Sequence, residues 1–426
     1  MLEKAQAIYF KIKNNHDYKR VVVNFLSLSL IQVSNYLIPL ITFPYLVRTL
    51  GFEMFGLVAF GQNIFAYFEQ IMSYSFMLTA PKDISQNSQD KVRVSQIFHK
   101  VLFTKLFLLF LCLVFVLIIT LFVPRLNDIK PMMWAGIVIL LANVLQFDWF
   151  FQGVQEMKNI TILNLSARFL SIALLFVFVK NPSDTVAALI FLPICNVFVG
   201  FIALLLIYRK FKIPFTPPQY FDVFEQLKSG FQIFMSQFMV RFYGADFNIT
   251  LLGFLSNNLA LGIYTFANRI YGLATSATGS LSTALYPHLA KLYAENIDQY
   301  RKQFKTILVS LFVIFAFLGL CLFLSADTIT TLLVGYPTPE SSFILRILSF
   351  ALVFAPFGSL YTQAYIILGR DRYLLWTNLI CILINAPFLF IFYYYFQEVG
   401  LAMTNVVVLL ALSFFPLIFF RRWNIL

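Results

Sequence analysis

Three arginines lie inside long apolar stretches of this 426-residue chain: Arg168, Arg241 and Arg269. A charge at the centre of a membrane-spanning helix costs about 2.5–3.5 kcal/mol on insertion scales, so such groups usually face a bundle interior or a water-filled cavity. A guanidinium presents a planar fork that matches phosphate and carboxylate oxygens. The three arginines therefore predict a cationic cavity that binds an anionic substrate carrying phosphate groups.

Acidic and amide side chains accompany these arginines. Glu69 and Asp246 either pair with the arginines or carry coupling protons in turn, and Asp148 is a third candidate for ion coupling. Asn248 and Asn268 complete the predicted substrate-binding set. Arg241 and Asn248 are seven residues apart, which would place them on one face of a continuous helix.

Four further charged residues have a structural alternative. Lys100, Lys105, Asp148 and Arg346 are predicted close enough to a bilayer interface for their side chains to reach water. For these residues the sequence leaves open a structural role beside a functional one.

The composition requires a membrane environment for such charges. The chain is 60% hydrophobic and only 12% charged, whereas a soluble domain is about a quarter charged. This excludes disorder and disulfide scaffolds and argues strongly against a soluble enzyme. Membrane β-barrels fit poorly, because their strands alternate apolar and polar residues. We expect an all-α polytopic membrane protein.

Twelve apolar segments are long enough to cross a bilayer, since a spanning helix needs about 20 residues. They lie near 21–47, 54–78, 96–123, 132–150, 159–179, 185–207, 231–254, 260–290, 305–325, 343–367, 373–396 and 400–420. We expect an N-terminal segment (1–20), a six-helix bundle (21–207), a linker rich in Pro and charge (208–229), a second six-helix bundle (230–420) and a tail (421–426).

The basic residues in the loops predict the orientation. With both termini in the cytoplasm, twenty-one Lys and Arg residues fall on the cytoplasmic side and four on the opposite side. This asymmetry follows the positive-inside rule. It also accounts for most of the net charge of +12, and because these residues are scattered over short loops, they do not suggest nucleic-acid binding.

Catalytic and nucleotide-binding motifs are absent from the sequence. It contains no Walker loop, no HExxH and no GxGxxG, and its three histidines are far apart. We therefore predict a protein that is not an enzyme and needs neither a metal nor a cofactor.

A weak internal repeat links the two halves. Residues 55–65 read FGLVAFGQNIF and residues 261–271 read LGIYTFANRIY, so that Gly, Phe and Ile recur in register. Each copy begins the second segment of its half. An even number of segments per half gives both copies the same orientation, which predicts a parallel pseudo-two-fold axis along the membrane normal and a central cavity between the bundles.

Two motifs resemble a known family. Residues 35–51 read NYLIPLITFPYLVRTLG and residues 147–153 read FDWFFQG. Both are similar to the O-antigen flippases (Wzx-type polysaccharide transporters) of the multidrug/oligosaccharidyl-lipid/polysaccharide exporter superfamily. The resemblance covers nearly the whole chain in length, segment count and motif order. Arg48 matches the first motif; it either joins the substrate-binding set or anchors the turn between the first two segments.

The resemblance implies an activity. A flippase of this family, in the bacterial inner (plasma) membrane, would move an undecaprenyl-diphosphate-linked oligosaccharide repeat unit, such as O-antigen, between leaflets by alternating access. Coupling to protons, and partners such as a polysaccharide polymerase and chain-length machinery, are further expectations. The alternatives are a drug or small-molecule exporter on the same scaffold, which the basic cavity disfavours, and a membrane polysaccharide polymerase, which the short outer loops disfavour.

Overall fold

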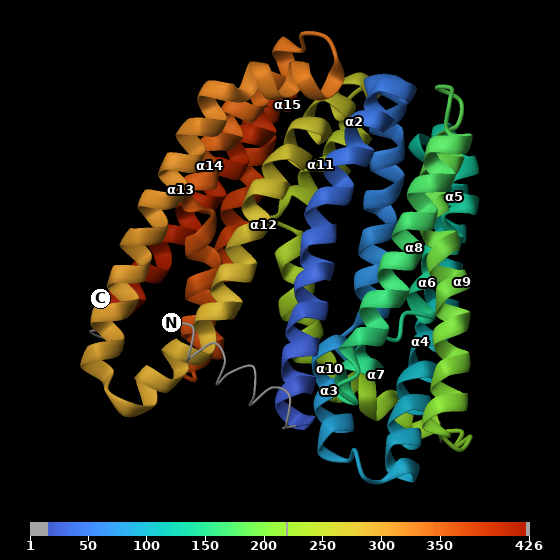
Figure 1. The fold of residues 1–426 in the computed structure, drawn as a ribbon. Helices are drawn as coiled ribbons and strands as arrows, with labels where there is room; N and C mark the ends of the chain where they lie inside the picture. Colours follow the sequence, from blue (N-terminus) through green and yellow to red (C-terminus); the bar gives the residue numbers. More distant parts are fainter. Residues whose placement is uncertain (1–15, 219, 423–426) are drawn as a thin grey trace, which may run out of the picture. The chain divides into compact units, whose positions relative to one another are not determined.

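The computed structural model describes residues 16–218 and 220–422, and every regular element in these ranges is helical (Figure 1). The predicted N-terminal segment and tail lie largely outside the described residues. The helices are α2 (His16–Ser73), α3 (Phe76–Gln86), α4 (Lys91–Phe122), the 3-10 helix η1 (Pro124–Ile129), α5 (Lys130–Ala135), α6 (Ile137–Val144), α7 (Asp148–Gly153), α8 (Met157–Phe178), α9 (Thr185–Phe211), α10 (Tyr220–Arg241), α11 (Ala245–Leu255), α12 (Asn258–Glu295), α13 (Ile297–Val334), α14 (Pro339–Ile367) and α15 (Asp371–Arg422). The predicted all-helical architecture is confirmed for these ranges.

Two of the long helices are each a pair of helices joined at a break. In α2 the break is at Gly51, with φ 75° and ψ 165°, and in α15 it is at Gln397, with φ 52° and ψ −132°. Glycine adopts a positive φ without the steric cost that a side chain would add, which suits Gly51 to this reversal. The first helix of α2 therefore ends at the motif that carries Arg48.

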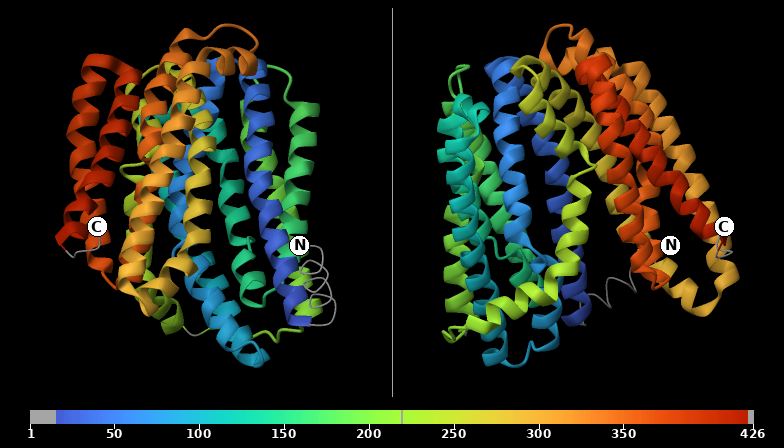
Figure 2. Two further views of the ribbon diagram at one scale, coloured as in Figure 1. Left: turned by 60° about the vertical axis from the view of Figure 1, so that its left-hand side comes forward. Right: turned by 180° about the vertical axis from the view of Figure 1, so that it is seen from behind.

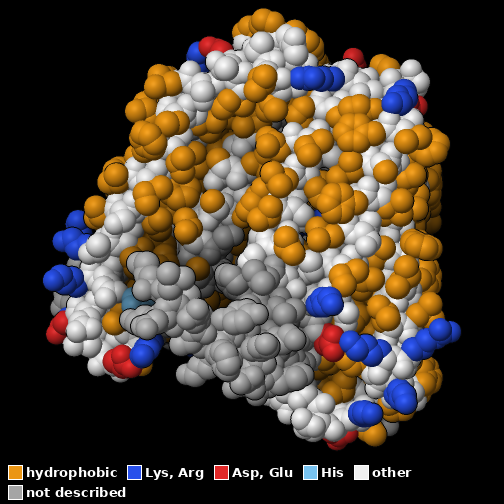
Figure 3. Space-filling view, in the orientation of Figure 1, with side chains coloured by type: hydrophobic (Ala, Val, Ile, Leu, Met, Phe, Trp, Pro, Cys, Tyr) orange, Lys and Arg blue, Asp and Glu red, His pale blue; other side chains and the backbone are white. Residues whose placement is uncertain are grey.

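Seven described helices are long and apolar enough to cross a membrane, or eight if the bent pair Pro124–Ala135 and Ile137–Gly153 forms one span. Two of the seven contain the breaks at Gly51 and Gln397, so each contributes a second helix. The helices α10, α11 and α12 are not among these candidate spans, so the count of twelve membrane-spanning segments remains a prediction. In Figure 3 hydrophobic side chains cover the middle of the visible face, and most of the visible Lys and Arg side chains lie towards its upper and lower margins.

The described chain forms two compact units. One contains the residues up to Phe43 together with Ile64–Phe234, and the other contains Pro44–Asn63 together with Met235–Leu426. Residues 44–63 thus pack with the elements of the second half of the chain. The division into bundles at 21–207 and 230–420 remains a prediction.

An aromatic cluster forms the packing centre of the first unit, and the FDWFFQG motif supplies much of it. The ring of Phe98 on α4 lies 5.5–5.8 Å from the rings of Phe147, Trp149 and Phe150. Trp149 and Phe150 are almost completely buried. Burial of such rings is strongly favourable, so the motif fixes the short helix α7 against α4.

In the second unit α13, α14 and α15 run side by side (Figure 2). Aromatic rings join them: Phe304 of α13 stacks on Phe420 of α15 with ring centroids 5.8 Å apart, and the tilted ring of Tyr361 of α14 lies 5.2 Å from Phe420.

The two copies of the repeat meet within the second unit. A Cβ added to Gly56 would lie 2.5 Å from the carbonyl oxygen of Asn258, and a Cβ added to Gly262 would lie 1.9 Å from the carbonyl oxygen of Phe52. Gly56 and Gly262 are 206 residues apart, and so are Phe52 and Asn258. Each glycine therefore packs against the residue of the other copy that corresponds to its partner's contact, and the contact is reciprocal. Glycine at both positions lets the backbones approach this closely, as in other membrane helix pairs.

Candidate functional site

Polar groups of the second unit gather at a break between two helices. The helix α10 ends at Arg241, and α11 begins at Ala245 after the extended Gly244. Asp246 lies in the first turn of α11. The N-terminal end of a helix carries partial positive charge, which favours an anionic group there.

Asp246 interacts with two arginines. Its Oδ2 lies 2.5 Å from an Nη1 of Arg241, and it also interacts electrostatically with Arg269 of α12. The Nη2 of Arg269 donates to Gln62 at 2.7 Å, and the amide of Asn63 donates to the backbone carbonyl of Asp246 and to the hydroxyl of Thr250. Two guanidinium groups and one carboxylate give this cluster a net charge of +1.

The described groups of this cluster are partly accessible. The side chain of Arg241 is 24% exposed and that of Asp246 is 42% exposed, and Arg269 is half-buried. A ligand can therefore reach the ion pair without unfolding of the surrounding helices. The sequence predicts Arg241, Asp246 and Arg269, and the structure brings these three together. Sequence reasoning does not identify Gln62 and Asn63, although both lie within the repeat.

Asn248 lies elsewhere. Its amide nitrogen faces the hydroxyl of Tyr264 at 3.3 Å and the carbonyl of Leu401 at 3.4 Å, and only 1% of the residue is exposed. The prediction that Arg241 and Asn248 share a helix face is wrong, because the helix ends at Arg241 and starts again at Ala245. Asn268 is also buried. A substrate-binding role for either asparagine remains a prediction.

Arg48 contacts the end of another helix. Its Nε donates to the carbonyl of Leu333 at 2.8 Å, and its Nη2 donates to the carbonyl of Leu332 at 2.7 Å. These are among the last carbonyls of α13, which ends at Val334 before Gly335 with φ 96°. A cation stabilises a helix C-terminus through the helix dipole. In this structure Arg48 therefore caps α13, and substrate binding by Arg48 remains a prediction.

The first unit contains a polar cavity of about 70 Å³ at the break between α6 and α7. Glu69, Gln146, Asp148, Asn164 and Asn196 are among its lining residues. The amide of Gln146 donates to Asp148 at 3.0 Å, and that of Asn164 lies 3.3 Å from the same carboxylate. The structure thus brings together two of the three carboxylates predicted for ion coupling.

Two basic residues accompany these carboxylates. Arg168 of α8 is half-buried, donates to the hydroxyl of Ser34 at 2.6 Å, and interacts electrostatically with Asp148. Lys105 of α4 is only 3% exposed and interacts electrostatically with Asp148 and Glu69. Each charge of this cluster therefore has a group of opposite sign near it.

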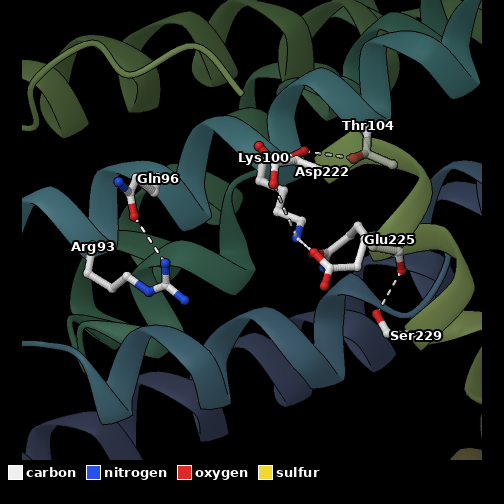
Figure 4. A network of polar contacts seen from close by, with 8 residues as sticks. Arg93, Gln96, Lys100, Thr104, Asp222, Glu225 and Ser229 are labelled. Carbon is white, nitrogen blue, oxygen red and sulfur yellow. Dashed lines mark hydrogen bonds and ion pairs between the residues drawn. The ribbon is translucent and has the colours of Figure 1, made fainter. Parts of the chain in front are cut away.

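The interface position predicted for Lys105 is wrong. The side chain lies inside the first unit, because the backbone carbonyls at the α6–α7 break accept hydrogen bonds from it. Lys100, by contrast, is half-buried on α4 and forms ion pairs with Glu225 at 2.7 Å and Asp222 at 4.0 Å (Figure 4). Arg346 is paired with Asp327 on the preceding helix α13.

Comparisons with known proteins agree on a class. A family model described as polysaccharide biosynthesis protein matches residues 21–293. A protein of Escherichia coli (strain K12) named as a candidate O-antigen transporter is 31% identical over 326 residues, covering 76% of this chain and 78% of that protein. A Shigella dysenteriae protein with the same name is 28% identical, covering 63% of this chain and 67% of that protein.

Solved structures share the fold. A multidrug resistance MATE family transporter of the MOP superfamily, in an inward-facing conformation, superposes with a TM-score of 0.74 at 15% identity and covers 94% of this chain and 99% of its own. The lipid II flippase MurJ, in an inward closed conformation, gives a TM-score of 0.74 at 14% identity and covers 93% of this chain and 87% of its own. The described helices therefore adopt a multi-pass transporter fold.

Proposed function

The chain belongs to the polysaccharide biosynthesis protein family, in the group of O-antigen flippases, and from this premise we propose that it translocates a lipid-linked oligosaccharide across the bacterial inner membrane. The observation that carries this proposal is the cluster of Arg241, Asp246 and Arg269 at the α10–α11 break. Its net positive charge suits a diphosphate, which is the group that joins a polyprenyl lipid to its sugars.

In this proposal Asp246 is the resident counter-ion of Arg241. A diphosphate carries more negative charge than one carboxylate and offers several oxygens to two guanidinium forks. It would displace Asp246 from Arg241 and bind beside the N-terminus of α11, where the helix dipole favours an anion. When the diphosphate leaves, Asp246 would pair with Arg241 again, so neither state leaves that arginine without an anion.

Ion coupling is the second part of the proposal. Glu69 and Asp148 line a cavity large enough for water, which suits carboxylates that take up and release protons. Asp246 is the third candidate for proton coupling, because in this proposal it pairs with Arg241 only when no diphosphate is bound. Transport in vesicles that does not change when the proton gradient is collapsed would contradict proton coupling and leave the flippase proposal standing.

The same proposal places both termini in the cytoplasm, in keeping with the distribution of basic residues. It includes a polysaccharide polymerase and chain-length machinery as partners that use the translocated product. A small-molecule exporter is the alternative function, favoured by the fold shared with the MATE family transporter. The net positive cluster argues for anions, so such an exporter would carry an anionic compound.

Complementation tests the proposal. The chain is expressed in a polysaccharide-producing bacterium that lacks its own flippase, and surface polymer is measured together with the pool of undecaprenyl-diphosphate oligosaccharide. We expect restored polymer and a drained pool. Persistent failure with several glycans, despite protein in the membrane, would contradict the proposal.

Arginine variants connect the activity to the cluster. Arg241→Ala and Arg269→Ala should each lower surface polymer while the amount of membrane protein is maintained. A lost charge-assisted hydrogen bond of about 1.5–3 kcal/mol corresponds to roughly ten- to 100-fold weaker binding. Arg301→Ala is the control, because Arg301 pairs with Asp298 within one turn of α13. Normal polymer from both cluster variants would refute the assignment of the diphosphate site.

A further inference from the structure

The backbone carbonyls of Asn143 and Gln146 lie at the break between α6 and α7, and that of Asn143 also accepts the backbone N–H of Gln146 at 3.3 Å. The helix α6 ends at Val144, and α7 starts at Asp148. The last carbonyls of a helix lack partners within the helix and form the negative end of its dipole. Inside a membrane protein such groups need a donor or a cation.

The ammonium group of Lys105 occupies this place. Its Nζ donates to the carbonyl of Asn143 at 2.7 Å, faces the side-chain oxygen of Asn143 at 3.3 Å, and faces the carbonyl of Gln146 at 3.5 Å. An ammonium has three N–H groups, and three oxygens surround it here. Neutral backbone and amide oxygens at unwound helices are also the ligands that coordinate alkali cations in transporters.

The surrounding charges balance without a further cation. Lys105 interacts electrostatically with Asp148 of α7 and Glu69 of α2, and Asp148 also interacts electrostatically with Arg168 of α8. Two basic and two acidic side chains make this set electrically neutral. The adjoining cavity of about 70 Å³ is lined by both carboxylates and by amides, and it has room for about two water molecules.

We propose that Lys105 is a tethered cation that fills a monovalent-cation site at the α6–α7 break. The first unit therefore binds no Na⁺ at this place, and the ions that it exchanges are protons carried by Glu69 and Asp148 through the water-sized cavity. Removal of the Lys105 side chain leaves an oxygen-lined site that accepts a small primary ammonium ion. This inference deepens the proposed function, since it assigns the coupling chemistry of the same transporter.

Chemical rescue tests the inference on purified full-length protein in detergent. Lys105→Ala removes three methylenes and the ammonium group, and n-propylammonium restores those atoms. The melting temperature is measured in propylammonium, sodium and choline chlorides at equal ionic strength. Lys105→Met fills the space without charge, and Lys100→Ala removes a lysine of the same helix from the exposed ion pair with Glu225 (Figure 4).

We expect the wild-type protein to melt at the same temperature in sodium and choline chlorides. Lys105→Ala should melt at a lower temperature than the wild-type protein, and propylammonium should raise its melting temperature saturably, by about 1–2 °C at ten times its Kd. Lys105→Met and Lys100→Ala should show no such rise. A saturable rise in the melting temperature of the wild-type protein with Na⁺ would overturn the inference. A folded Lys105→Ala variant whose melting temperature does not change with propylammonium would also overturn it.

If Lys105→Ala does not fold, the sodium and choline titrations of the wild-type protein decide alone, because saturable Na⁺ binding contradicts a filled site and its absence supports one. The melting experiments do not depend on transport. Failed complementation together with successful propylammonium rescue would therefore contradict the proposed function and leave the cation site intact.

Discussion

The contact between Gly262 of α12 and Phe52 of α2 allows a quantitative prediction. A Cβ at position 262 would lie 1.9 Å from the carbonyl oxygen and 2.6 Å from the carbonyl carbon of Phe52, whereas ordinary contacts begin at 3.4 Å. The shortfall to the oxygen is about 1.5 Å. Both atoms belong to the backbone, so no side chain can rotate away and the two helices must separate.

The expected cost follows from this separation. Overpacking of a well-packed site typically costs about 1–3 kcal/mol, and here the displaced element is a helix that also carries Phe52 against Phe266, with ring centroids 5.6 Å apart. Gly262→Ala should therefore lower the free energy of unfolding by at least about 2 kcal/mol. The assay is denaturant unfolding of the purified protein in micelles, followed by far-ultraviolet circular dichroism.

The helix α12 supplies its own controls. Gly272 and Gly279 lie on the same helix, and an added Cβ would meet nothing within 4 Å at either position. Alanine there should be neutral or should stabilise by up to about 1 kcal/mol, because glycine is the poorer helix former. If Gly262→Ala unfolds at the same denaturant concentration as Gly272→Ala, the close helix contact is refuted.

The reciprocal contact adds a second criterion. Gly56→Ala should also destabilise, since its Cβ would lie 2.5 Å from the carbonyl oxygen of Asn258. One separation of the two helices would relieve both clashes. The double variant Gly56→Ala/Gly262→Ala should therefore cost less than the sum of the single variants, as expected for directly coupled sites. Strict additivity would show that the two glycines do not share one contact.

Three further substitutions test separate contacts by the same unfolding assay. Arg48→Ala should cost about 1 kcal/mol by removing two hydrogen bonds from the C-terminus of α13, and an unchanged unfolding curve would show that this cap contributes nothing. Asp90→Ala should cost about 0.5–2 kcal/mol because Asp90 accepts from the backbone N–H groups of Val92 and Arg93 at the start of α4, whereas Asp90→Ser should keep most of that stability. Asn248→Ala should cost about 1–3 kcal/mol by removing a buried polar contact with Tyr264, and loss of polymer without loss of stability would instead assign Asn248 to substrate binding.

Local chemistry explains why the helices were predictable. Long apolar runs can satisfy their backbone groups in a membrane only as helices or closed barrels, so composition and segment length indicated the architecture. Turn residues did not reveal every break. The interruption after Arg241 lies in a stretch that reads as one apolar segment, and for that reason the sequence predicts wrongly that Arg241 and Asn248 share one helix face.

The candidate site was likewise predictable from the sequence only in part. Arg241, Arg269 and Asp246 stood out because an ionised group is costly in an apolar stretch, and this cost can be read without a structure. The sequence predicts an interface position for Lys105, because its distance from the end of an apolar run is compatible with a side chain that reaches water. Its true partners, Asn143 and Gln146, are about forty residues away in the chain.

By itself, the sequence determined that the chain is a helical membrane protein with basic groups inside its spans, because the apolar fraction and the charges act locally, residue by residue. Only the tertiary structure decided which charged side chains contact one another and which backbone groups they bind. It joined residues 44–63 to the second unit, directed Arg48 to α13, paired Asp246 with Arg241 and surrounded Lys105 with oxygens. Such pairings depend on contacts between residues far apart in the chain, and no local pattern records them.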